Sequence, residues 1–415
     1  MAAQMSGQGE AVTMQWEQVL ATRTGRMKAS EIRELLKLLD QPDILSFAGG
    51  IPDPALFPVA AFQAAMAGAL GPGRAETALQ YSVSEGYLPL RRWLAAHMTG
   101  LGVPCGVDNI LITSGSQQGL DYLGKLMISP KDTVLVNWPT YMGALGAFNA
   151  YEPQYDRLDG RDNRGAEQYR AKAAEAGGRV KFAYLSTDFA NPTGETVSLQ
   201  GRERVLDLME DLGGAVVEDA AYQALRYDGA AIPPILALEI ARKGSIEDCR
   251  TIYCGSFSKT LAPGLRVGWV CAAAPVIARL VLMKQAADLH SGTINQMAVA
   301  EVAETIFETH VAGVRAVYKA RRDHMLAALA RHMPAGVDWT RPEGGMFVWI
   351  TLPEGMDGAD LLARSLATER VAFVPGRAFF ADGSGGNTIR LSFSRADEAA
   401  IDEGIARLGR LIAAR

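Results

Sequence analysis

A repeated alternation of short apolar segments with helical segments, beginning near residue 108 of 415, constrains this fold most. Helices are predicted after several of these segments, including one at residues 120–128. The predicted strands cover residues 110–113, 133–137, 182–186, 215–217, 251–253 and 267–271. Apolar strands separated by helices are typical of a mainly parallel sheet covered on both faces. Polar motifs directly follow several strands, where open α/β sheets bind their ligands.

The pattern changes after about residue 330 to a mixture of strands and helices, including the segments GGMFVWI and NTIRLSFS. We therefore expect an α/β chain with a large domain (residues 61–329) and a smaller α+β domain (residues 21–60 and 330–415). Residues 1–20 carry weak periodicity and are predicted to form an N-terminal arm. Residues 29–39 read as an amphipathic helix.

Composition and apolar stretches exclude several classes of protein. The 41 basic and 46 acidic residues give a net charge of 41 − 46 = −5, which argues against nucleic-acid binding. Prolines or polar residues interrupt the uncharged stretches 54–73 and 133–151, so neither is predicted to span a membrane. The proline-rich residues 51–58 are predicted to be an extended connection. The four cysteines form no CxxC pair and residues 1–10 resemble no signal peptide, so we expect a cytoplasmic protein.

The segment GSFSK places Lys259 beside Ser256 and Ser258 at the end of a predicted strand, with Arg266 seven residues later. An isolated lysine is usually an ordinary solvated cation. A lysine partly removed from water near other cations has a lowered pKa and can form a Schiff base. In that interpretation the two hydroxyls and the guanidinium form a phosphate site.

Four further positions each allow a structural and a functional interpretation. Asn191 begins NPTG, a good β-turn, and Asp219, three residues before Tyr222, is either a helix cap or a partner for a ring nitrogen. Ser116 and Gln117 begin a helix, where free N–H groups face either water or an anion. Arg390 lies in an apolar strand, so it needs either a structural carboxylate or a substrate's carboxylate.

Together these positions offer a phosphate site, a lysine able to form a Schiff base, a carboxylate for a ring nitrogen and an arginine for a carboxylate. Pyridoxal phosphate acting on an amino acid requires this combination. Over residues 20–410 the chain resembles the fold-type I, class I/II aminotransferases. Among these it most resembles the 2-aminoadipate aminotransferases, on the segments SFAGGIPDPALFP, LQYSVSEGYLPLR, SGSQQGLD, GSFSKTLAPGLRVGW and RPEGGMFVW. The resemblance implies that pyridoxal 5′-phosphate is the cofactor and that an amino group moves from an L-amino acid to 2-oxoglutarate by a ping-pong mechanism.

The resemblance also implies a role for each matching residue. Lys259 binds the cofactor covalently and moves the proton at the substrate's Cα, and Asp219 keeps the ring nitrogen protonated. Arg390 binds the α-carboxylate, assisted by Asn191 and the backbone at Gly50. The remaining cofactor contacts implied are Asn191 and Tyr222 at the ring oxygen, Tyr141 and Ala221 at the ring faces, and Ser116, Gln117, Ser256, Ser258 and Arg266 at the phosphate. Tyr81 is implied to reach the phosphate of the neighbouring subunit, which makes a homodimer part of the site.

Substrate choice is implied by the helix near the N-terminus. Its Ser30 and Arg33 match a serine and an arginine that bind substrate in the aminoadipate enzymes, although Arg33 could also be an exposed helix charge. The chain departs from its relatives at Ala220, where many have an acidic residue, and at residues 189–190 before NPTG, where a polar residue is common.

Two alternatives use the same scaffold: a pyridoxal-phosphate lyase, and a sensing module like those of certain transcription regulators, for which we expect no room before residue 20. The five histidines lack metal-ligand spacing, so no metal is expected.

Overall fold

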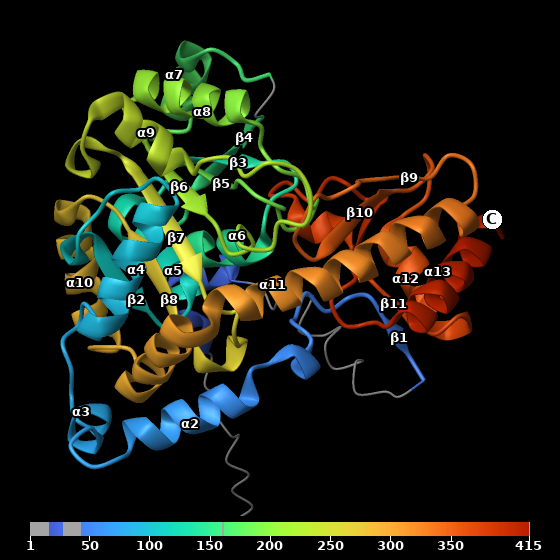
Figure 1. Ribbon diagram of the computed structural model, residues 1–415. Coiled ribbons are helices and arrows are strands. Elements are labelled where there is room, and N and C mark those ends of the chain that lie inside the picture. Colours follow the sequence, from blue (N-terminus) through green and yellow to red (C-terminus); the bar gives the residue numbers. More distant parts are fainter. Residues whose placement is uncertain (1–15, 28–42, 160–161, 415) are drawn as a thin grey trace, which may run out of the picture.

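The computed structural model describes residues 16–27, 43–159 and 162–414 (Figure 1). Two units lie side by side, and helix α11 (Thr293–His332) runs along both. At 1.5 Å per residue, the 40 residues of α11 extend roughly 60 Å. The predicted domain boundary at residue 330 falls in its last turn. The predicted helix at residues 29–39, with Ser30 and Arg33, lies outside the described residues, as does most of the predicted arm.

A mixed but mainly parallel sheet forms the larger unit, which confirms the predicted α/β class. Strand β8 runs antiparallel to both of its neighbours, and all other adjacent pairs are parallel. In spatial order the strands are β2 (Ile110–Thr113), β8 (Gly268–Cys271), β7 (Thr251–Ser256), β6 (Ala215–Asp219), β5 (Val180–Ser186), β3 (Thr133–Asn137) and β4 (Gln154–Leu158).

Side chains alternate between two apolar cores, one on each face of this sheet. In β3, Val134 and Val136 enter one core and Leu135 enters the other. The first core is covered by α5 (Ser116–Met127), α6 (Met142–Asn149) and α10 (Ala274–Ala287). The opposite face is covered by α4 (Leu88–Gly100), α7 (Ala166–Glu175), α8 (Leu199–Leu212), α9 (Ile235–Lys243) and the first half of α11. Burial on both faces explains why the strands read as continuous apolar runs.

Several elements extend beyond their predicted bounds into polar sequence. Strand β6 continues to Asp219 because Asp219 pairs in register with Ser186 on one side and with Cys254 on the other. Helix α5 begins at Ser116, four residues before the prediction of 120. The polar motifs therefore lie at the very ends of regular elements, where the backbone holds them firmly.

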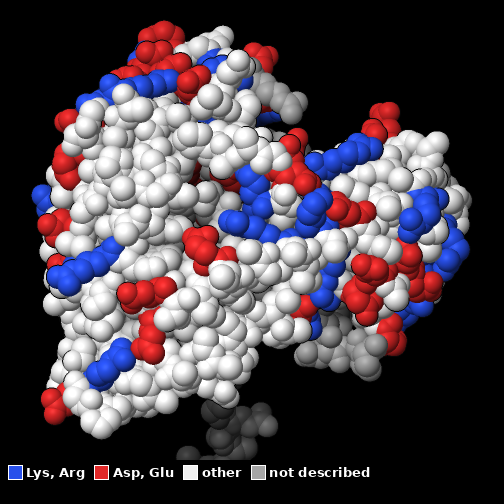
Figure 2. All heavy atoms as spheres, viewed as in Figure 1, with Lys and Arg blue, Asp and Glu red and all other residues white. Residues whose placement is uncertain are grey.

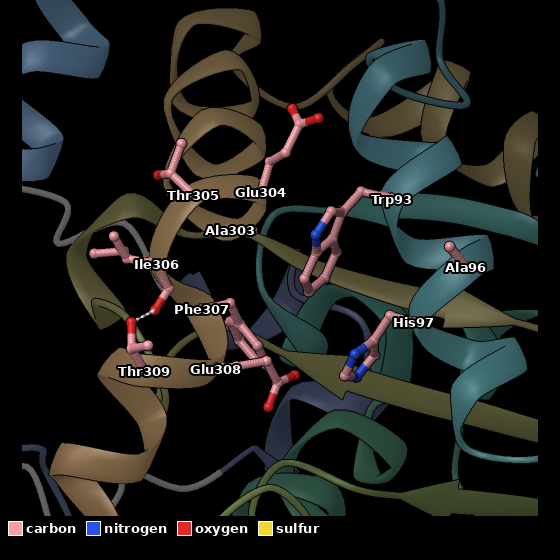
Figure 3. A pocket seen from close by; sticks show the side chains of 10 residues that line it. All are labelled: Trp93, Ala96, His97, Ala303, Glu304, Thr305, Ile306, Phe307, Glu308 and Thr309. Carbon is pink, nitrogen blue, oxygen red and sulfur yellow. Dashed lines mark hydrogen bonds between the residues drawn. The ribbon is translucent and has the colours of Figure 1, made fainter.

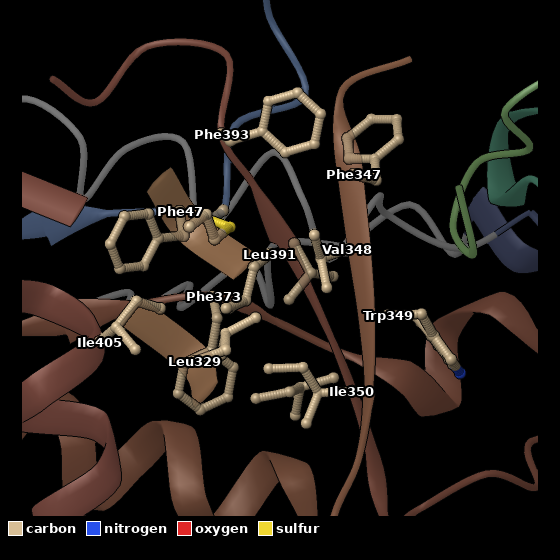
Figure 4. Packing of buried hydrophobic residues seen from close by; sticks show 14 of the residues in the cluster. Phe47, Leu329, Phe347, Val348, Trp349, Ile350, Phe373, Leu391, Phe393 and Ile405 are labelled. Atoms are coloured by element: carbon tan, nitrogen blue, oxygen red, sulfur yellow. The ribbon is translucent and has the colours of Figure 1, made fainter. Parts of the chain in front are cut away.

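The smaller unit is built around an antiparallel sheet and a two-stranded parallel pair. The antiparallel order is β12 (Val374–Pro375), β13 (Thr388–Ser392), β10 (Phe347–Thr351) and β9 (Asp338–Trp339). The parallel pair joins β1 (Leu45–Ser46) to β11 (Val371–Ala372), so an early segment completes a late core. Figure 4 shows Phe47 within the same apolar cluster as Phe373 and Ile405. Helices α12 (Gly358–Thr368) and α13 (Glu398–Ala413) cover this core.

Short elements connect the two units. Residues 51–58, predicted to be extended, contain the 3₁₀ turn η4 (Pro54–Leu56), which the side chain of Asp53 caps by accepting the N–H of Ala55. Helices α2 (Val59–Ala69) and α3 (Ala75–Leu79) follow along the edge of the larger unit. Other 3₁₀ turns are η1 (Trp16–Gln18), η2 (Thr22–Arg26), η5 (Val107–Asn109), η6 (Ile246–Asp248), η7 (Pro263–Leu265) and η8 (Gly376–Phe379). Among the described residues, no helix has both the length and the apolar character needed to cross a bilayer.

Candidate active site

A cavity of about 260 Å³ lies at the carboxyl ends of the central strands of the large sheet, against the smaller unit. Strand β7 leads to Lys259, β6 ends at Asp219, and β13 of the smaller unit contributes Arg390. The cavity is lined by Gly50, Ile51, Ser116, Gln117, Tyr141, Ser186, Asn191, Asp219, Ala221, Tyr222, Ser256, Ser258, Lys259, Pro263, Arg266 and Arg390. Residues that are far apart in the sequence therefore meet where a parallel sheet binds its ligand.

Lys259 presents its amine inside this cavity. Its Nζ donates to the carbonyl oxygen of Gly50 at 2.9 Å, across the junction of the two units. Burial, and then the positive charges of Arg390 and Arg266, lower the pKa of Lys259 to about 8, although the charge of Asp219 opposes this shift. The lowered pKa gives Lys259 a larger neutral fraction near neutral pH than an ordinary lysine has, which favours a role as nucleophile and base.

Asp219 is a buried carboxylate that neutral donors hold in place. Its Oδ2 accepts the hydroxyl of Tyr184 at 2.8 Å, and its Oδ1 accepts the N–H of Ala221 at 3.3 Å. Burial raises the pKa of Asp219, while these hydrogen bonds and Lys259 act to lower it. An anion in such a place favours a nearby cation, such as a protonated ring nitrogen. Tyr184 had no sequence signal, because it is one more aromatic residue in the apolar strand β5.

Several residues of the cavity lining are donors suited to a phosphate. The N-terminus of α5 at Ser116 and the hydroxyls of Ser256 and Ser258 line the cavity beside Arg266. Gly115 precedes this helix at φ 82°, and a Cβ there would lie 2.3 Å from Nη2 of Arg266. Glycine is therefore required for the arginine to pack against the turn. Free N–H groups, hydroxyls and a guanidinium together fit a phosphate dianion.

Arg390 is 1% exposed, and its positive charge has no acidic partner among the described residues. Its Nη1 donates to Oδ1 of Asn191 at 2.7 Å and its Nη2 to the carbonyl of Ala48 at 2.8 Å, both of which are neutral. The guanidinium carbon lies 4.3 Å from the centre of the Phe347 ring, and the buried Nε has no hydrogen-bond partner. Burial lowers the pKa of Arg390 to about 10. The structural carboxylate considered from the sequence is thus not seen, and the charge is available to an anion in the cavity.

Three polar side chains complete the cavity. Tyr222 is buried and shares a hydrogen bond with Asn191, and burial raises the pKa of its hydroxyl. Burial and the charge of Asp219 raise the pKa of Tyr141 to about 12, so both phenols remain protonated. Nε2 of Gln117 donates to the carbonyl of Gly143 at 2.7 Å, which anchors the first turn of α5 to the start of α6.

Some predicted residues lie apart from this cavity. The side chain of Tyr81 is 79% exposed, and its ring contacts His290 with the ring centres 6.0 Å apart. Ser30 and Arg33 lie outside the described residues. Sequence reasoning missed Ile51, Ser186 and Pro263 as lining residues, although each directly neighbours or ends a motif that was recognised.

A second cavity, of about 310 Å³, lies between α4 and α11 (Figure 3). The stacked rings of Trp93 and His97 face Phe307, and Glu304 and Glu308 lie at its edge. None of the predicted site residues lines it. Its larger volume therefore does not mark it as the functional site.

Known proteins that are similar to this chain are consistent with the geometry of the cavity. Residues 43–408 match the family described as "Aminotransferase class I and II". The chain is 43% identical to a 2-aminoadipate transaminase of Thermus thermophilus, over 96% of this chain and 98% of the relative. It is 41% identical to aromatic-amino-acid aminotransferase 1 of Thermococcus litoralis, over 97% of this chain and 96% of the relative.

A solved structure extends the likeness to three dimensions. The α-aminoadipate aminotransferase of Thermus thermophilus, complexed with N-(5′-phosphopyridoxyl)-L-leucine, matches with a TM-score of 0.86 and 41% identity, covering 97% of this chain and 99% of that chain. The chain therefore belongs to the class I and II aminotransferases and is a transaminase whose cofactor is pyridoxal phosphate.

Proposed function

We propose that this enzyme moves the amino group of a 2-aminoadipate-like, branched-chain or aromatic L-amino acid to 2-oxoglutarate by a ping-pong mechanism. The observation that carries the proposal is the pairing of two features in one cavity. Arg390 offers a positive charge that no acidic side chain of the described residues pairs with, and Lys259 offers an amine with a lowered pKa. An L-amino acid carries an α-carboxylate, which would pair with Arg390, and a proton on the adjacent Cα, which the neutral amine of Lys259 would accept.

Bound pyridoxal phosphate would supply an electron-withdrawing ring that weakens the substrate's Cα–H bond. Lys259 would hold the cofactor covalently and then move the proton at Cα as a positioned general base. Asp219 would keep the ring nitrogen protonated, since a buried anion stabilises a cation beside it.

The other cavity residues would position these groups. Asn191 and Tyr222 would donate to the ring oxygen, Tyr141 would stack on the ring, and Gly50 would assist Arg390 with its backbone. The phosphate would be held by Ser116, Gln117, Ser256, Ser258 and Arg266. The donors seen in the cavity support these roles.

The donor classes are supported by the relatives, whose names specify 2-aminoadipate and aromatic amino acids. We propose that Ser30 and Arg33 bind a distal carboxylate when the substrate has one. An apolar side chain would pack on Ile51 at the cavity wall.

A homodimer in the cytoplasm is part of the same proposal, with Tyr81 completing the partner's phosphate site. Exposed apolar side chains at the edge of the larger unit support it, namely Val59, Leu70, Leu79, Val83 and Leu88. The four cysteines are free thiols, as expected in a reducing compartment. We also propose that residues 1–20 form an arm, residues 61–329 the large domain, and residues 21–60 with 330–415 the small domain.

An amino-donor panel tests the function. Glutamate formation from 2-oxoglutarate is measured with 2-aminoadipate, leucine, kynurenine, aspartate and aromatic amino acids. Transfer from 2-aminoadipate together with apolar donors is expected. Transfer from aspartate alone would refute the proposed donor class, and borohydride trapping of the cofactor on a lysine other than Lys259 would refute the assigned site.

A further inference from the structure

Between the cavity-lining residues Ser186 and Asn191 in the sequence, the carboxylate of Asp188 is shared by two arginines. Asp188 accepts Nη2 of Arg202 at 2.9 Å with one oxygen and Nη2 of Arg226 at 2.8 Å with the other. The side chains of Asp188 and Arg202 are 3% and 0% exposed, and that of Arg226 is 12% exposed. Arg202 is fixed further by the carbonyls of Thr187 and Pro233. Asp188 is thus held tightly three residues before Asn191.

The other terminal nitrogen of Arg226, Nη1, contacts the smaller unit. This Nη1 lies 3.1 Å from Oε2 of Glu343, and the backbone of Arg226 forms an antiparallel bridge with Gly344. The N–H of Gly345 donates to the carbonyl of Leu225 at 2.9 Å. Charged side chains of both signs gather over this junction of the two units in Figure 2. Arg226 therefore ties the Asn191 segment to the chain that enters β10.

Phe189 fills the space between these groups. Its ring centre lies 4.7 Å from the guanidinium carbon of Arg226, and its backbone adopts a φ of 51°. A Cβ on Gly344 would lie 2.4 Å from the Phe189 ring, so only glycine allows this approach. The Phe189 position, noted from the sequence as a departure from relatives, is thus a packed contact between the units.

Arg226 is connected to Arg390 through two sets of contacts. In the first set, Arg226 contacts Asp188, which lies three residues before Asn191, and Oδ1 of Asn191 accepts a hydrogen bond from Nη1 of Arg390. In the second set, Arg226 contacts Glu343, which precedes strand β10, and Trp349 of β10 pairs in register with Arg390. We propose that Arg226 is a positioning residue for α-carboxylate binding, which keeps Asn191 and Arg390 aligned across the junction. This inference rests on the proposed function, because it assumes that Arg390 binds the substrate's carboxylate.

The test compares Arg226→Gln with the wild type as holoenzyme. Binding of glutarate and of 3-phenylpropionate is followed through the cofactor's visible absorption band. We expect both dissociation constants and the amino-acid KM to rise roughly tenfold, while kcat falls by less than about threefold. Arg226→Lys is expected to restore only part of the affinity, because a point charge cannot bridge two carboxylates as a guanidinium does.

Arg91→Gln is the matched control, because Arg91 is also buried and bonds the carbonyls of Val107 and Ile110 away from the cavity. It should lower thermal stability without changing carboxylate affinity. A double-mutant cycle with Asn191→Ala adds the decisive readout, since the two changes must be non-additive if Arg226 acts through Asn191.

Additive effects in that cycle, or carboxylate affinities unchanged in Arg226→Gln, would overturn the inference. A wild type that binds both carboxylates but transfers no amino group would instead refute the proposed function and leave the positioning role measurable.

Discussion

Two groups of buried charges have partners of opposite kinds. Outside the cavity lining, Asp188, Arg202 and Glu218 are almost fully buried, and each faces opposite charge. Inside the cavity, Arg390 is equally buried, yet its partners are neutral. Burying an unpaired charge is costly, so a fold keeps one only where a ligand compensates it.

Whether a buried charge has a charged partner in the fold separates structural charges from those that face the cavity. Glu218 and Asp219 are consecutive residues of β6, and burial raises the pKa of both. Glu218 accepts the N–H groups of Ile235 and Leu236 and faces Arg202, so all of these partners belong to the fold itself. Asp219 lines the cavity instead. Changes in the cavity should therefore act on binding and turnover, and changes in the paired group should act on stability.

Removing the amine of the cavity should have the largest effect. Lys259→Ala is expected to lower turnover by at least about 10³-fold, because the proposed covalent anchor and the proposed general base would be lost together. Thermal unfolding should change little, and binding of inorganic phosphate should be retained. Turnover within tenfold of the wild type would show that another group moves the proton.

Breaking the paired group should act on stability. Arg202→Gln leaves Asp188 and Glu218 with less compensation, so the free energy of unfolding should fall by about 3–5 kcal/mol. Denaturant unfolding measures this. The surface pair of Arg242 and Asp207 gives the control, since Arg242→Gln should cost no more than about 1 kcal/mol. Equal losses in the two variants would erase the distinction drawn above.

Arg390→Gln should have the reverse profile, with a small effect on stability and a large one on binding. We expect the KM of every amino acid to rise about 10- to 100-fold, as for a lost charge-assisted hydrogen-bond pair. The rise should be similar for dicarboxylic and apolar donors, because both share the α-carboxylate. A loss confined to dicarboxylic donors would assign Arg390 to the side-chain end of the substrate.

A pH profile should show the smallest effect. Because the pKa of Lys259 is lowered to about 8, the neutral amine increases as pH rises through that value. The rate at which apo-protein captures pyridoxal phosphate should therefore rise with pH and level off above about 9. In Arg390→Gln the midpoint should move to higher pH, because a positive charge that opposes protonation is gone. A rate still rising steeply at pH 10 would indicate an unperturbed lysine.

Much of the site was predictable because its residues follow strands. The predicted strands at 110–113 and 133–137 match β2 and β3, and Asp219, Lys259 and Asn191 all line the predicted edge of the sheet. Tyr184 and Ala48 were missed, although they hold Asp219 and Arg390. One is hidden in an apolar strand and the other acts through its carbonyl, so neither residue type carries a signal.

The order of apolar strands and polar motifs was enough to determine the α/β class, the cofactor chemistry and which polar motifs follow the strands, because period and position are local properties of the chain. Only the tertiary structure decided which charges are compensated. Arg202 and Arg390 are both buried arginines. What separates them is that the carboxylates of Asp188 and Glu218 lie beside Arg202, whereas the hydrogen-bond partners of Arg390 are neutral. Which side chains meet is a property of packing, which no local sequence pattern records.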